Sequence, residues 1–442
     1  MKRRFVLYNL LAILGVRLFS GRNILSKIIS ASSIISSSKV SAYDSTSDPI
    51  GKPFNIIIGY GQSNMTGRQY TSKLETHFSI HPRMLMFKSA KSSVRFPPSG
   101  EGVKSYEITG FTSLRSTVST SLQQGATSLE GIAKRISMDC DILTDQSSSL
   151  CLSEVLFFSA AKGGYSIDQL GSGSKAYQSI LEGIQTSKRL LNKSAAINVP
   201  FLIFSQGESD TGNRNWSKEV RKLHRNLTND INKITGLNHR LRFIMTQLSS
   251  FGGYNSALQH LKLVEDDPET FFIATPGYAL PYFSDNVHYN SVGNIKKGEY
   301  EFKVIKALNN GYTWTGLRPK KVYLEESIIE LECYVPVPPL VHDSSLVDID
   351  EWGFSVFENG KNIELLNIEI ITSTRIRLVT KSVLKPGTHK TLSYGTRSYQ
   401  RIENKRIDGT GPGGQLRDSD SMQSFIDGNP LYNWMVHFSI AI

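Results

Sequence analysis

The sequence predicts an α/β protein, a parallel β-sheet with helices on both faces, followed by a β-rich domain. Two observations support this prediction. From residue 54, short apolar runs alternate with longer segments of helical periodicity, which is typical of a parallel sheet. After about residue 312 the pattern changes to short strand-like runs separated by turn residues. We therefore expect a leader and Ser-rich linker over residues 1–50, an α/β domain over 51–312 and a sandwich-like accessory domain over 313–442.

The predicted strands of the α/β domain are nearly continuous apolar runs. Such runs are expected when both faces of a sheet are covered, because the side chains on both faces are then buried. In chain order the predicted strands are Phe54–Gly59, Glu154–Ala160, Pro200–Ser205, Leu241–Leu248 and Phe271–Thr275.

Two predicted helices follow these strands. Residues 216–235 carry an apolar stripe at helical spacing, and residues 292–309 carry a looser one. A long insertion over residues 65–153 precedes the second strand. Within it we expect an extra strand at Arg83–Phe87 and a short helix near Leu129–Ile136.

The accessory domain is predicted from four strand-like runs, which are Val322–Glu332, Gly353–Glu358, Ile363–Ile371 and Arg375–Val379. Asn359-Gly360 lies between two of them and is a strong signal for a hairpin turn. The Gly-rich polar stretch Asp408–Asp420 is predicted as a loop, because no strand and helix flank it as they flank a phosphate-binding loop.

Composition and charge exclude some classes of function. Apolar residues make up 39% of the 442, enough for a sizeable core, so wholesale disorder is excluded. The net charge of +11 comes from 50 Lys+Arg against 39 Asp+Glu, but residues 1–42 hold seven basic residues and no acid. The remainder therefore carries 43 basic against 39 acidic groups, or +4. This balance gives little support for nucleic-acid binding, which needs basic residues clustered on one face.

The leader resembles a targeting or anchoring segment. A basic start at Lys2, Arg3 and Arg4 precedes the apolar run Phe5–Val16, which suits a signal peptide and is too short for a membrane span. A small-x-small sequence at residues 40–42 offers a cleavage point. The alternative is an amphipathic helix and Ser-rich linker that dock onto another protein, so the fate of residues 1–42 stays open.

The three cysteines do not make a disulfide framework. Cys140 and Cys151 are candidates for a bridge in an oxidising compartment, but the pairing is not readable from the sequence. Cys333 lies in an alternating apolar run and is predicted to be a small buried hydrophobe. No Cys/His spacing resembles a zinc site.

Polar residues follow the predicted strands at their carboxyl ends, where open parallel sheets bind ligands. The first group, Gly59–Met65 (Gly-Tyr-Gly-Gln-Ser-Asn-Met), follows the first strand. A serine on a tight glycine-bearing turn can project its hydroxyl above the sheet, which makes Ser63 a candidate nucleophile. The alternative is a loop that caps a helix with Ser63 or Asn64.

The second and third groups add candidate acid, base and oxyanion residues. Ser205–Asp210 follows the third strand, and the Gln206 amide there is a candidate donor to an oxyanion. Asp285-Asn286-Val287-His288 follows the last strand. A catalytic serine needs a base, and a histidine needs a carboxylate on its other nitrogen. Each group by itself is also compatible with a polar turn or a helix cap.

A fourth group, Lys162–Ile167, follows the strand at Glu154–Ala160. Its two glycines allow a backbone N–H to approach a substrate and to serve as a second oxyanion donor. The alternative is a glycine turn with no contact to the substrate.

Read in chain order, Ser63, Gly164, Gln206, Asp285 and His288 resemble the SGNH hydrolase superfamily. The sequences of the motifs are most similar to those of its sialate O-acetylesterase-like branch, which carries Gly-Gln-Ser-Asn-Met, Gly-Gly-x-Ser-Ile, Gln-Gly-Glu and Asp-x-x-His. All four motifs occur here, between about residues 54 and 300. The resemblance implies a flavodoxin-like three-layer α/β/α hydrolase domain.

The resemblance also implies the roles of the site residues. Ser63 would be the nucleophile, His288 the general base and acid, and Asp285 the group that orients the histidine. Oxyanion donors would be the backbone N–H groups of Ser63 and Gly164 and the side chain of Gln206. The remaining candidates for substrate binding lie beside these residues in the same motifs and are Gln62, Asn64 and Glu208.

The activity that the resemblance implies is removal of O-acetyl groups from a carbohydrate, with no metal or organic cofactor. Gly413–Asp420 and Pro430–Trp434 resemble the tail of esterases found in phage tail spikes and prophages. This implies a bacterial surface polysaccharide as substrate, an extracytoplasmic or virion-tail location, and attachment through the N-terminus or assembly as a homo-oligomer. The alternatives are an inactive polysaccharide-binding adhesin and an esterase for other acyl groups.

Overall fold

The computed structural model describes residues 53–67, 78–89, 93–94, 107–114, 126–141, 149–191, 195–238, 240–250, 255–346, 349–396 and 413–442. Residues 52–442 form one compact unit. The leader over residues 1–50 lies outside the described residues, so the export signal and the docking helix both stay predictions.

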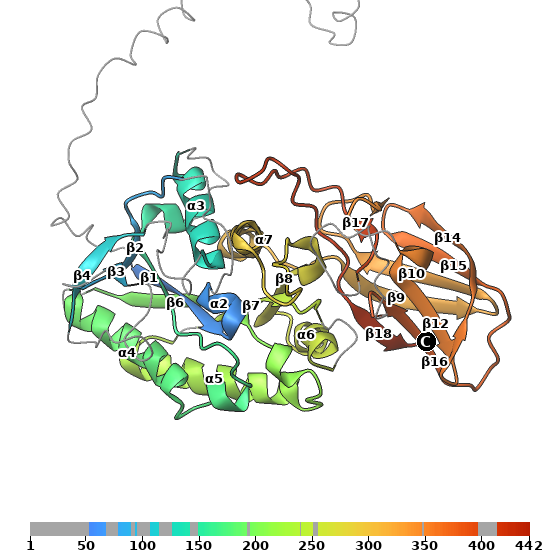
Figure 1. The fold of residues 1–442 in the computed structure, drawn as a ribbon, viewed down its shortest axis with the longest axis horizontal. Coiled ribbons are helices and arrows are strands. Elements are labelled where there is room, and N and C mark those ends of the chain that lie inside the picture. Colours follow the sequence, from blue (N-terminus) through green and yellow to red (C-terminus); the bar gives the residue numbers. More distant parts are fainter. Residues whose placement is uncertain are drawn as a thin grey trace, which may run out of the picture. The chain divides into compact units, whose positions relative to one another are not determined.

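The central element is an eight-stranded sheet (Figure 1). The strand order is β3-β2-β5-β1-β6-β7-β8, and β4 pairs with β2. Their bounds are Phe54–Gly61 for β1, Met84–Ser89 for β2, Ser93–Val94 for β3, Ile108–Ser113 for β4, Val155–Ser159 for β5, Ile197–Ser205 for β6, Arg242–Gln247 for β7 and Phe271–Pro276 for β8. Strands β2, β5, β1, β6, β7 and β8 run parallel to one another, and the edge strands β3 and β4 pair with β2 in antiparallel direction. The parallel sheet is therefore confirmed.

The strand order also identifies where a ligand would bind. Counted in chain order, the five strands β5-β1-β6-β7-β8 run 2-1-3-4-5, which is the flavodoxin-like order. In this order the chain reverses its direction of winding between β1 and β6, and the crevice at their carboxyl ends is the usual binding place. The predicted polar groups after these two strands therefore lie at the same edge of the sheet.

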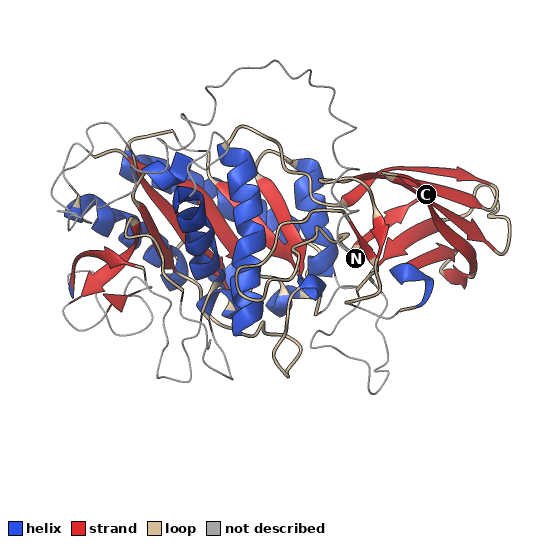
Figure 2. Cartoon of the chain, turned by 90° about the horizontal axis from the view of Figure 1, so that it is seen from above, coloured by secondary structure: helices blue, strands red, loops and turns tan. Residues whose placement is uncertain are grey.

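Helices cover both faces of the sheet, which confirms the three-layer α/β/α architecture (Figure 1), and Figure 2 looks onto one of these faces with its helices in front of the strands. Alternate residues of β1 divide the core: Ile57 packs with α3 and α7, whereas Ile56 and Ile58 pack with α4, α5 and α6. The helix bounds are Ser128–Asp141 for α3, Lys175–Leu190 for α4, Trp216–Thr235 for α5, Asn255–Asp266 for α6 and Ser291–Asn309 for α7.

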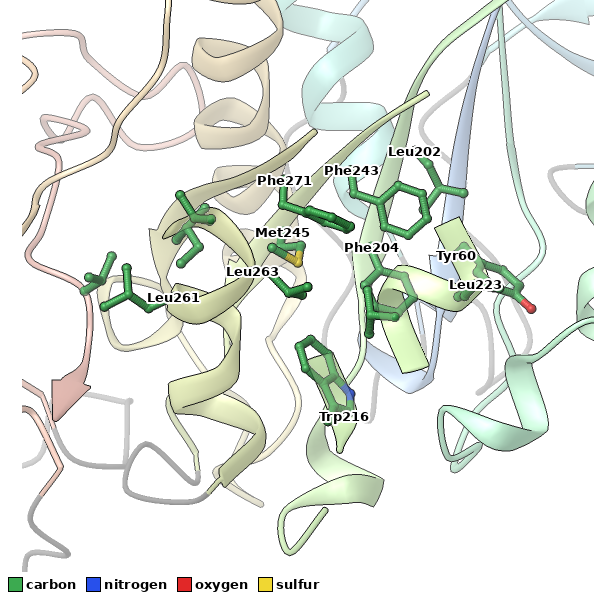
Figure 3. Close-up of a cluster of buried hydrophobic side chains, with 14 of the residues drawn as sticks. Tyr60, Leu202, Phe204, Trp216, Leu223, Phe243, Met245, Leu261, Leu263 and Phe271 are labelled. Carbon is green, nitrogen blue, oxygen red and sulfur yellow. The ribbon is translucent and has the colours of Figure 1, made fainter. Parts of the chain in front are cut away.

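A cluster of aromatic side chains fills the layer under α5 and α6 (Figure 3). Phe204 of β6 lies between Trp216 and Phe243, with ring centroids 6.4 Å and 5.4 Å away. Trp216 is fully buried, and its indole N–H needs a polar partner there. The partner is the Gln206 side chain, so the core of this layer is connected to one of the predicted site residues.

Helices α3 and α7 pack unusually closely through a pair of glycines. A Cβ atom at Gly298 would lie 2.0 Å from the carbonyl oxygen of Ser128, and one at Gly131 would lie 2.3 Å from that of Ile295. Only glycine permits this approach, because any side chain would overlap the backbone of the other helix. The Lys297–Glu301 ion pair, at 3.0 Å, is buried beside this contact.

The described residues of the C-terminal part are rich in β-strands, as predicted, and the pairs that these strands form are antiparallel. Two four-stranded sheets have the orders β14-β15-β10-β9 and β13-β12-β16-β18, and β11 pairs with β17. The bounds are Arg318–Glu325 for β9, Ile328–Tyr334 for β10, Val341–His342 for β11, Phe354–Glu358 for β12, Lys361–Ile363 for β13, Leu365–Thr372 for β14, Arg375–Thr380 for β15, Lys390–Tyr394 for β16, Leu416–Arg417 for β17 and Phe438–Ala441 for β18.

Of two hairpin turns in this part, one was predicted from the sequence and the other was not. The hairpin at Asn359-Gly360 is confirmed, because it joins β12 to β13 with φ of 47° and 77° at the two residues. The single strand-like run Val322–Glu332 is instead a hairpin. Glu326, at φ 52°, lies in the turn between β9 and β10. Glutamate is not a residue typical of turns, so the sequence predicted one strand where the structure has β9 and β10.

The C-terminal segment, residues 413–442, returns to the α/β part (Figure 1). Asp427 pairs with Lys296, and Asp420 pairs with Lys303, both at 2.8 Å. Arg135 of α3 donates to the carbonyl oxygen of Gln423. Helix α7 is thus buried between α3 and this segment. The division into domains at residue 312 stays a prediction.

The predicted Gly-rich loop Asp408–Asp420 is described only from residue 413, and there it contains the short strand β17. Cys333 is buried, as predicted, and burial raises the pKa of its thiol. The side chain of Cys151 lies outside the described residues, so the Cys140–Cys151 pairing stays open. No helix among the described residues has the length and hydropathy of a membrane span.

Candidate active site

Three side chains from two distant parts of the chain form a hydrogen-bonded row at the carboxyl edge of the sheet. His288 Nε2 lies 2.8 Å from Ser63 Oγ, and His288 Nδ1 lies 2.6 Å from Asp285 Oδ2. Ser63 follows β1, and the other two residues follow β8. The structure therefore brings together the three residues that the sequence singled out for nucleophile, base and orienting carboxylate.

The turn around Asp285 explains how one short loop supplies two of these groups. Asn286 has a left-handed backbone with φ of 59°, which asparagine tolerates better than most residues. The chain can then fold back, so that Asp285 Oδ1 accepts the backbone N–H groups of Val287 and His288, both at 2.9 Å. Its other oxygen remains free to accept from the His288 ring.

The same contacts set the electrostatics of Asp285. Partial burial by itself would raise the pKa of this carboxyl group. The hydrogen bonds from the backbone and ring of His288 and from the Val287 N–H outweigh burial, so the pKa lies below its usual value. Asp285 is thus held as a carboxylate next to the imidazole.

Ser63 opens a one-turn helix, α2 (Ser63–Thr66), directly after β1. The turn before it requires glycine: Gly61 has φ of 126°, and a Cβ there would lie 1.9 Å from the carbonyl oxygen of Ser205. Ser63 is only 6% exposed. The turn is further held by the Ser159 hydroxyl, which donates to the carbonyl oxygen of Met65 at 3.0 Å.

The glycine group after β5 reaches Ser63 through Gly163. A Cβ at Gly163 would lie 3.8 Å from Ser63 Cβ, whereas one at Gly164 would meet no atom within 4 Å. Gly164 has a left-handed backbone with φ of 75°, so glycine is favoured there for conformation. Its predicted oxyanion role stays a prediction, and Gly163 is the nearer neighbour of the serine.

Gln206 lies in a dense network of protein hydrogen bonds. Its Nε2 donates to Asp210 Oδ2, with longer contacts to the Tyr165 carbonyl oxygen at 3.3 Å and to Gln62 Oε1 at 3.4 Å. Its Oε1 accepts from the Trp216 indole. These contacts join the loops after β1, β5 and β6. They occupy the amide that we predicted as an oxyanion donor, and that role stays a prediction.

The three predicted substrate-binding side chains are also bonded to the protein. Gln62 Oε1 accepts from the backbone N–H of Ser209 at 3.3 Å, and Asn64 Nδ2 donates to Glu208 Oε1 at 2.7 Å. Gln62 and Asn64 are buried. Burial raises the pKa of Glu208, despite the hydrogen bond from Asn64. In this structure the three residues connect loops, and their contact with substrate stays a prediction.

Residues 53–305, more than half of the chain, match a protein family described as "Carbohydrate esterase, sialic acid-specific acetylesterase". The chain belongs to this family of carbohydrate esterases. Among solved structures, XAC1771, "a novel carbohydrate acetylesterase from Xanthomonas citri", is 14% identical and has a TM-score of 0.54. The match covers 87% of this chain and 80% of that one, and it supports the fold of both parts.

Two smaller structures match over 57% of this chain. A protein from Arabidopsis thaliana is 18% identical, is covered to 98% and has a TM-score of 0.38. NanS is 12% identical, is covered to 96% and has a TM-score of 0.39. No curated protein matches the chain. The predicted recognition as a carbohydrate esterase is confirmed by the family match.

The carbohydrate esterase places two further residues at the site that the sequence did not reveal. Trp216 donates to the Gln206 side chain, and Tyr289 donates to the Asn64 side chain. Tyr289 acts through its backbone N–H, which leaves no trace in side-chain chemistry. Trp216 had a weak signal, an aromatic residue at the start of a predicted helix. Among the described residues, no cluster of His, Cys, Asp or Glu is arranged to hold a metal ion.

Proposed function

We propose that this carbohydrate esterase is a serine O-acetylesterase that removes acetyl groups from a glycan, in the first place a bacterial surface polysaccharide. The observation that carries the proposal is the continuous hydrogen-bonded row from Ser63 Oγ through the His288 ring to Asp285. A serine hydroxyl bonded to an imidazole that is bonded in turn to a carboxylate is the arrangement that activates a serine nucleophile.

The reaction has two half-reactions. Ser63 Oγ attacks the acetyl carbonyl carbon while His288 Nε2 takes the hydroxyl proton. The tetrahedral intermediate collapses, the ester bond to the sugar breaks, and His288 returns the proton to the departing sugar oxygen. Water then attacks the acetyl-enzyme, gives its proton to His288, and acetate leaves as Ser63 recovers a proton. Proton transfer by the histidine contributes about 10²–10⁴-fold to the rate.

Charge on the carbonyl oxygen needs hydrogen-bond donors in both half-reactions. The backbone N–H of Ser63 is one candidate, and the glycine turn at Gly163 and Gly164 offers another beside the serine. Loss of one such donor costs about 10²–10³ in rate. For the Gln206 amide to act as a third donor, the N–H that does not bond Asp210 would have to leave its longer contacts with the Tyr165 carbonyl oxygen and Gln62 Oε1.

The first experiment measures acetate release from p-nitrophenyl acetate and from an O-acetylated bacterial polysaccharide. We expect release from both by the wild type and none by Ser63→Ala, with unchanged melting temperature. Ser419→Ala, which removes a hydroxyl that donates to the Pro339 carbonyl oxygen in the C-terminal part, is the matched control and should keep full activity. Activity that survives in Ser63→Ala would remove this serine from the mechanism. Polysaccharide binding without acetate release would favour an adhesin.

A comparison of acetyl and octanoyl p-nitrophenyl esters tests the size of the acyl group. We propose a preference for acetate, and a higher kcat/KM for the octanoyl ester would point to a lipid substrate instead.

We also propose an extracytoplasmic or virion-tail location, supported by the basic and apolar leader. Detection of the protein in the culture medium, the periplasm or purified phage particles, together with its N-terminal sequence, tests that location.

A further inference from the structure

We propose that Asn64 is a positioning residue, which fixes the distance between Ser63 and His288 by joining the three loops of the site. This inference rests on the proposed function, because it assumes that Ser63 and His288 carry the reaction. It assigns to Asn64 a role inside the protein, in place of the contact with substrate that the sequence motif suggested.

Three of the four hydrogen-bonding positions of the Asn64 amide are used. Nδ2 donates to Glu208 Oε1 at 2.7 Å and to the carbonyl oxygen of Val287 at 3.1 Å. Oδ1 accepts the backbone N–H of Tyr289 at 3.2 Å. An asparagine amide has two N–H donors and a carbonyl oxygen with two lone pairs, so these partners leave only one lone pair. Little is left for a substrate.

The backbone partners of Asn64 flank His288, so they control the position of the histidine relative to Ser63. Val287 and Tyr289 immediately precede and follow His288, and Asn64 immediately follows Ser63. One buried side chain therefore holds the backbone on both sides of the histidine against the turn that carries the serine. A shift of Asn64 would change the 2.8 Å separation of Ser63 Oγ and His288 Nε2 directly.

Glu208 connects the loop after β6 to the two loops that Asn64 already joins. It begins the short turn after β6, so the Asn64–Glu208 bond adds the third loop. Glu208 Oε2 is buried and has no hydrogen-bond partner in the described part of the chain. The hydrogen bonds that favour its ionised form against burial come first from the backbone N–H of Glu208 itself and next from the Asn64 N–H. A hydrogen bond to a charged group is stronger than one between neutral groups, so the Asn64–Glu208 bond holds the two loops together strongly.

The experiment compares kcat and KM for p-nitrophenyl acetate in four variants. Asn64→Ala removes all three bonds, and we expect kcat to fall about 100-fold with KM changed less than about threefold, as for a misplacement near 1 Å. Glu208→Ala should lower kcat to a similar degree. Glu208→Gln retains an oxygen that accepts from Asn64, so its kcat should stay within about tenfold of the wild type.

Asn433→Ala is the matched control. Asn433 is likewise a buried asparagine whose Nδ2 donates to a carboxylate, that of Asp418 at 2.6 Å, but it lies in the C-terminal segment. We expect a lower melting temperature and an unchanged kcat. The labelling rate of Ser63 by a fluorophosphonate, measured in every variant, reports activation of the serine without the second half-reaction. It should fall in parallel with kcat.

Each outcome decides between the ideas. The positioning role is overturned if Asn64→Ala keeps its kcat, if its loss appears in KM alone, or if Asn433→Ala loses as much activity. A Glu208→Gln variant as inactive as Glu208→Ala would assign the effect to the charge of Glu208 instead. Glu208→Gln keeps the shape of the site, so its kcat relative to that of Glu208→Ala tests the positioning role if Asn64→Ala does not fold. The proposed function fails separately, if the wild type releases no acetate or Ser63→Ala still does.

Discussion

The close contact of α3 with α7 makes a sharp prediction for the substitution Gly298→Ala. In an isolated helix this change is favourable by about 1 kcal/mol, because alanine has the higher helix propensity. Here the new methyl group would lie 2.0 Å from the carbonyl oxygen of Ser128. Cβ atoms essentially never approach closer than 3.0 Å, so the helices must separate by about 1.0 Å (3.0 − 2.0).

The net cost follows from two opposing effects. Overpacking of this kind costs about 1–3 kcal/mol. We expect the upper end, because the clash is with backbone and because the buried Lys297–Glu301 pair restricts any shift of α7. Subtracting the gain in helix propensity leaves about 2 kcal/mol. For the 391 residues of 52–442, an unfolding entropy of about 2.1 cal/mol/K per residue converts this into a loss of roughly 2–3 °C in Tm.

Calorimetry of four proteins tests this reasoning: the wild type, Gly298→Ala, Gly131→Ala and the double variant. The two Cβ positions face each other across one contact, so the double variant should be less destabilised than the sum, by at least about 0.5 kcal/mol. Gly212→Ala, where a methyl group meets no atom within 4 Å, is the control and should leave Tm nearly unchanged. A Gly298→Ala variant with an unchanged or higher Tm would refute the argument.

Three further predictions follow from the site and its surroundings. Asp285→Asn should lower kcat by about 10⁴-fold in the p-nitrophenyl acetate assay while the fold persists; near-normal kcat would exclude Asp285 from the row. Burial raises the pKa of Glu208 above 4.5, so the folded chain binds this proton more tightly than the unfolded chain does. The stability of the wild type relative to Glu208→Gln should therefore fall as pH rises from about 4 to 7 in urea titrations, and a rise would contradict this sign. Arg135→Met removes the partner of buried Glu299 and should cost about 3–5 kcal/mol by urea unfolding, part of which the added change Glu299→Gln should restore.

The α/β part was predictable where its strands are fully buried. The run from Phe54 to Gly59 is apolar except for Asn55, as expected of a parallel strand that is covered on both faces. Strand β4 was missed because its sequence, Ile-Thr-Gly-Phe-Thr-Ser, is polar and pairs only with β2 at the edge. Helices α4 and α6 do carry apolar residues at helical spacing, but Gly183 and several Ser and Thr residues weaken the pattern in α4.

The candidate site was predictable as a set of residues and less so as a set of contacts. Ser63, Asp285 and His288 stand out because each follows a strand and because their chemistry is complementary. The contacts of Asn64 were not predictable, since two of its three partners are backbone groups of Val287 and Tyr289. The inward direction of the Gln206 amide depends on Trp216, which lies ten residues further along the chain.

The return of the C-terminal segment to α7 has a consequence for how the protein is made. Translation runs from the N-terminus, so Lys303 is synthesised 117 residues before its partner Asp420 (420 − 303). At about 5–20 residues per second, the ribosome needs roughly 6–23 s to supply that partner. During this interval the ammonium group of Lys303 and the carboxylate of Glu299 lack groups that they contact in the finished fold. A nascent or recombinant chain that stops near residue 312 therefore exposes charged surface on α7 that the full chain covers, and chaperones or proteases would meet it in that state.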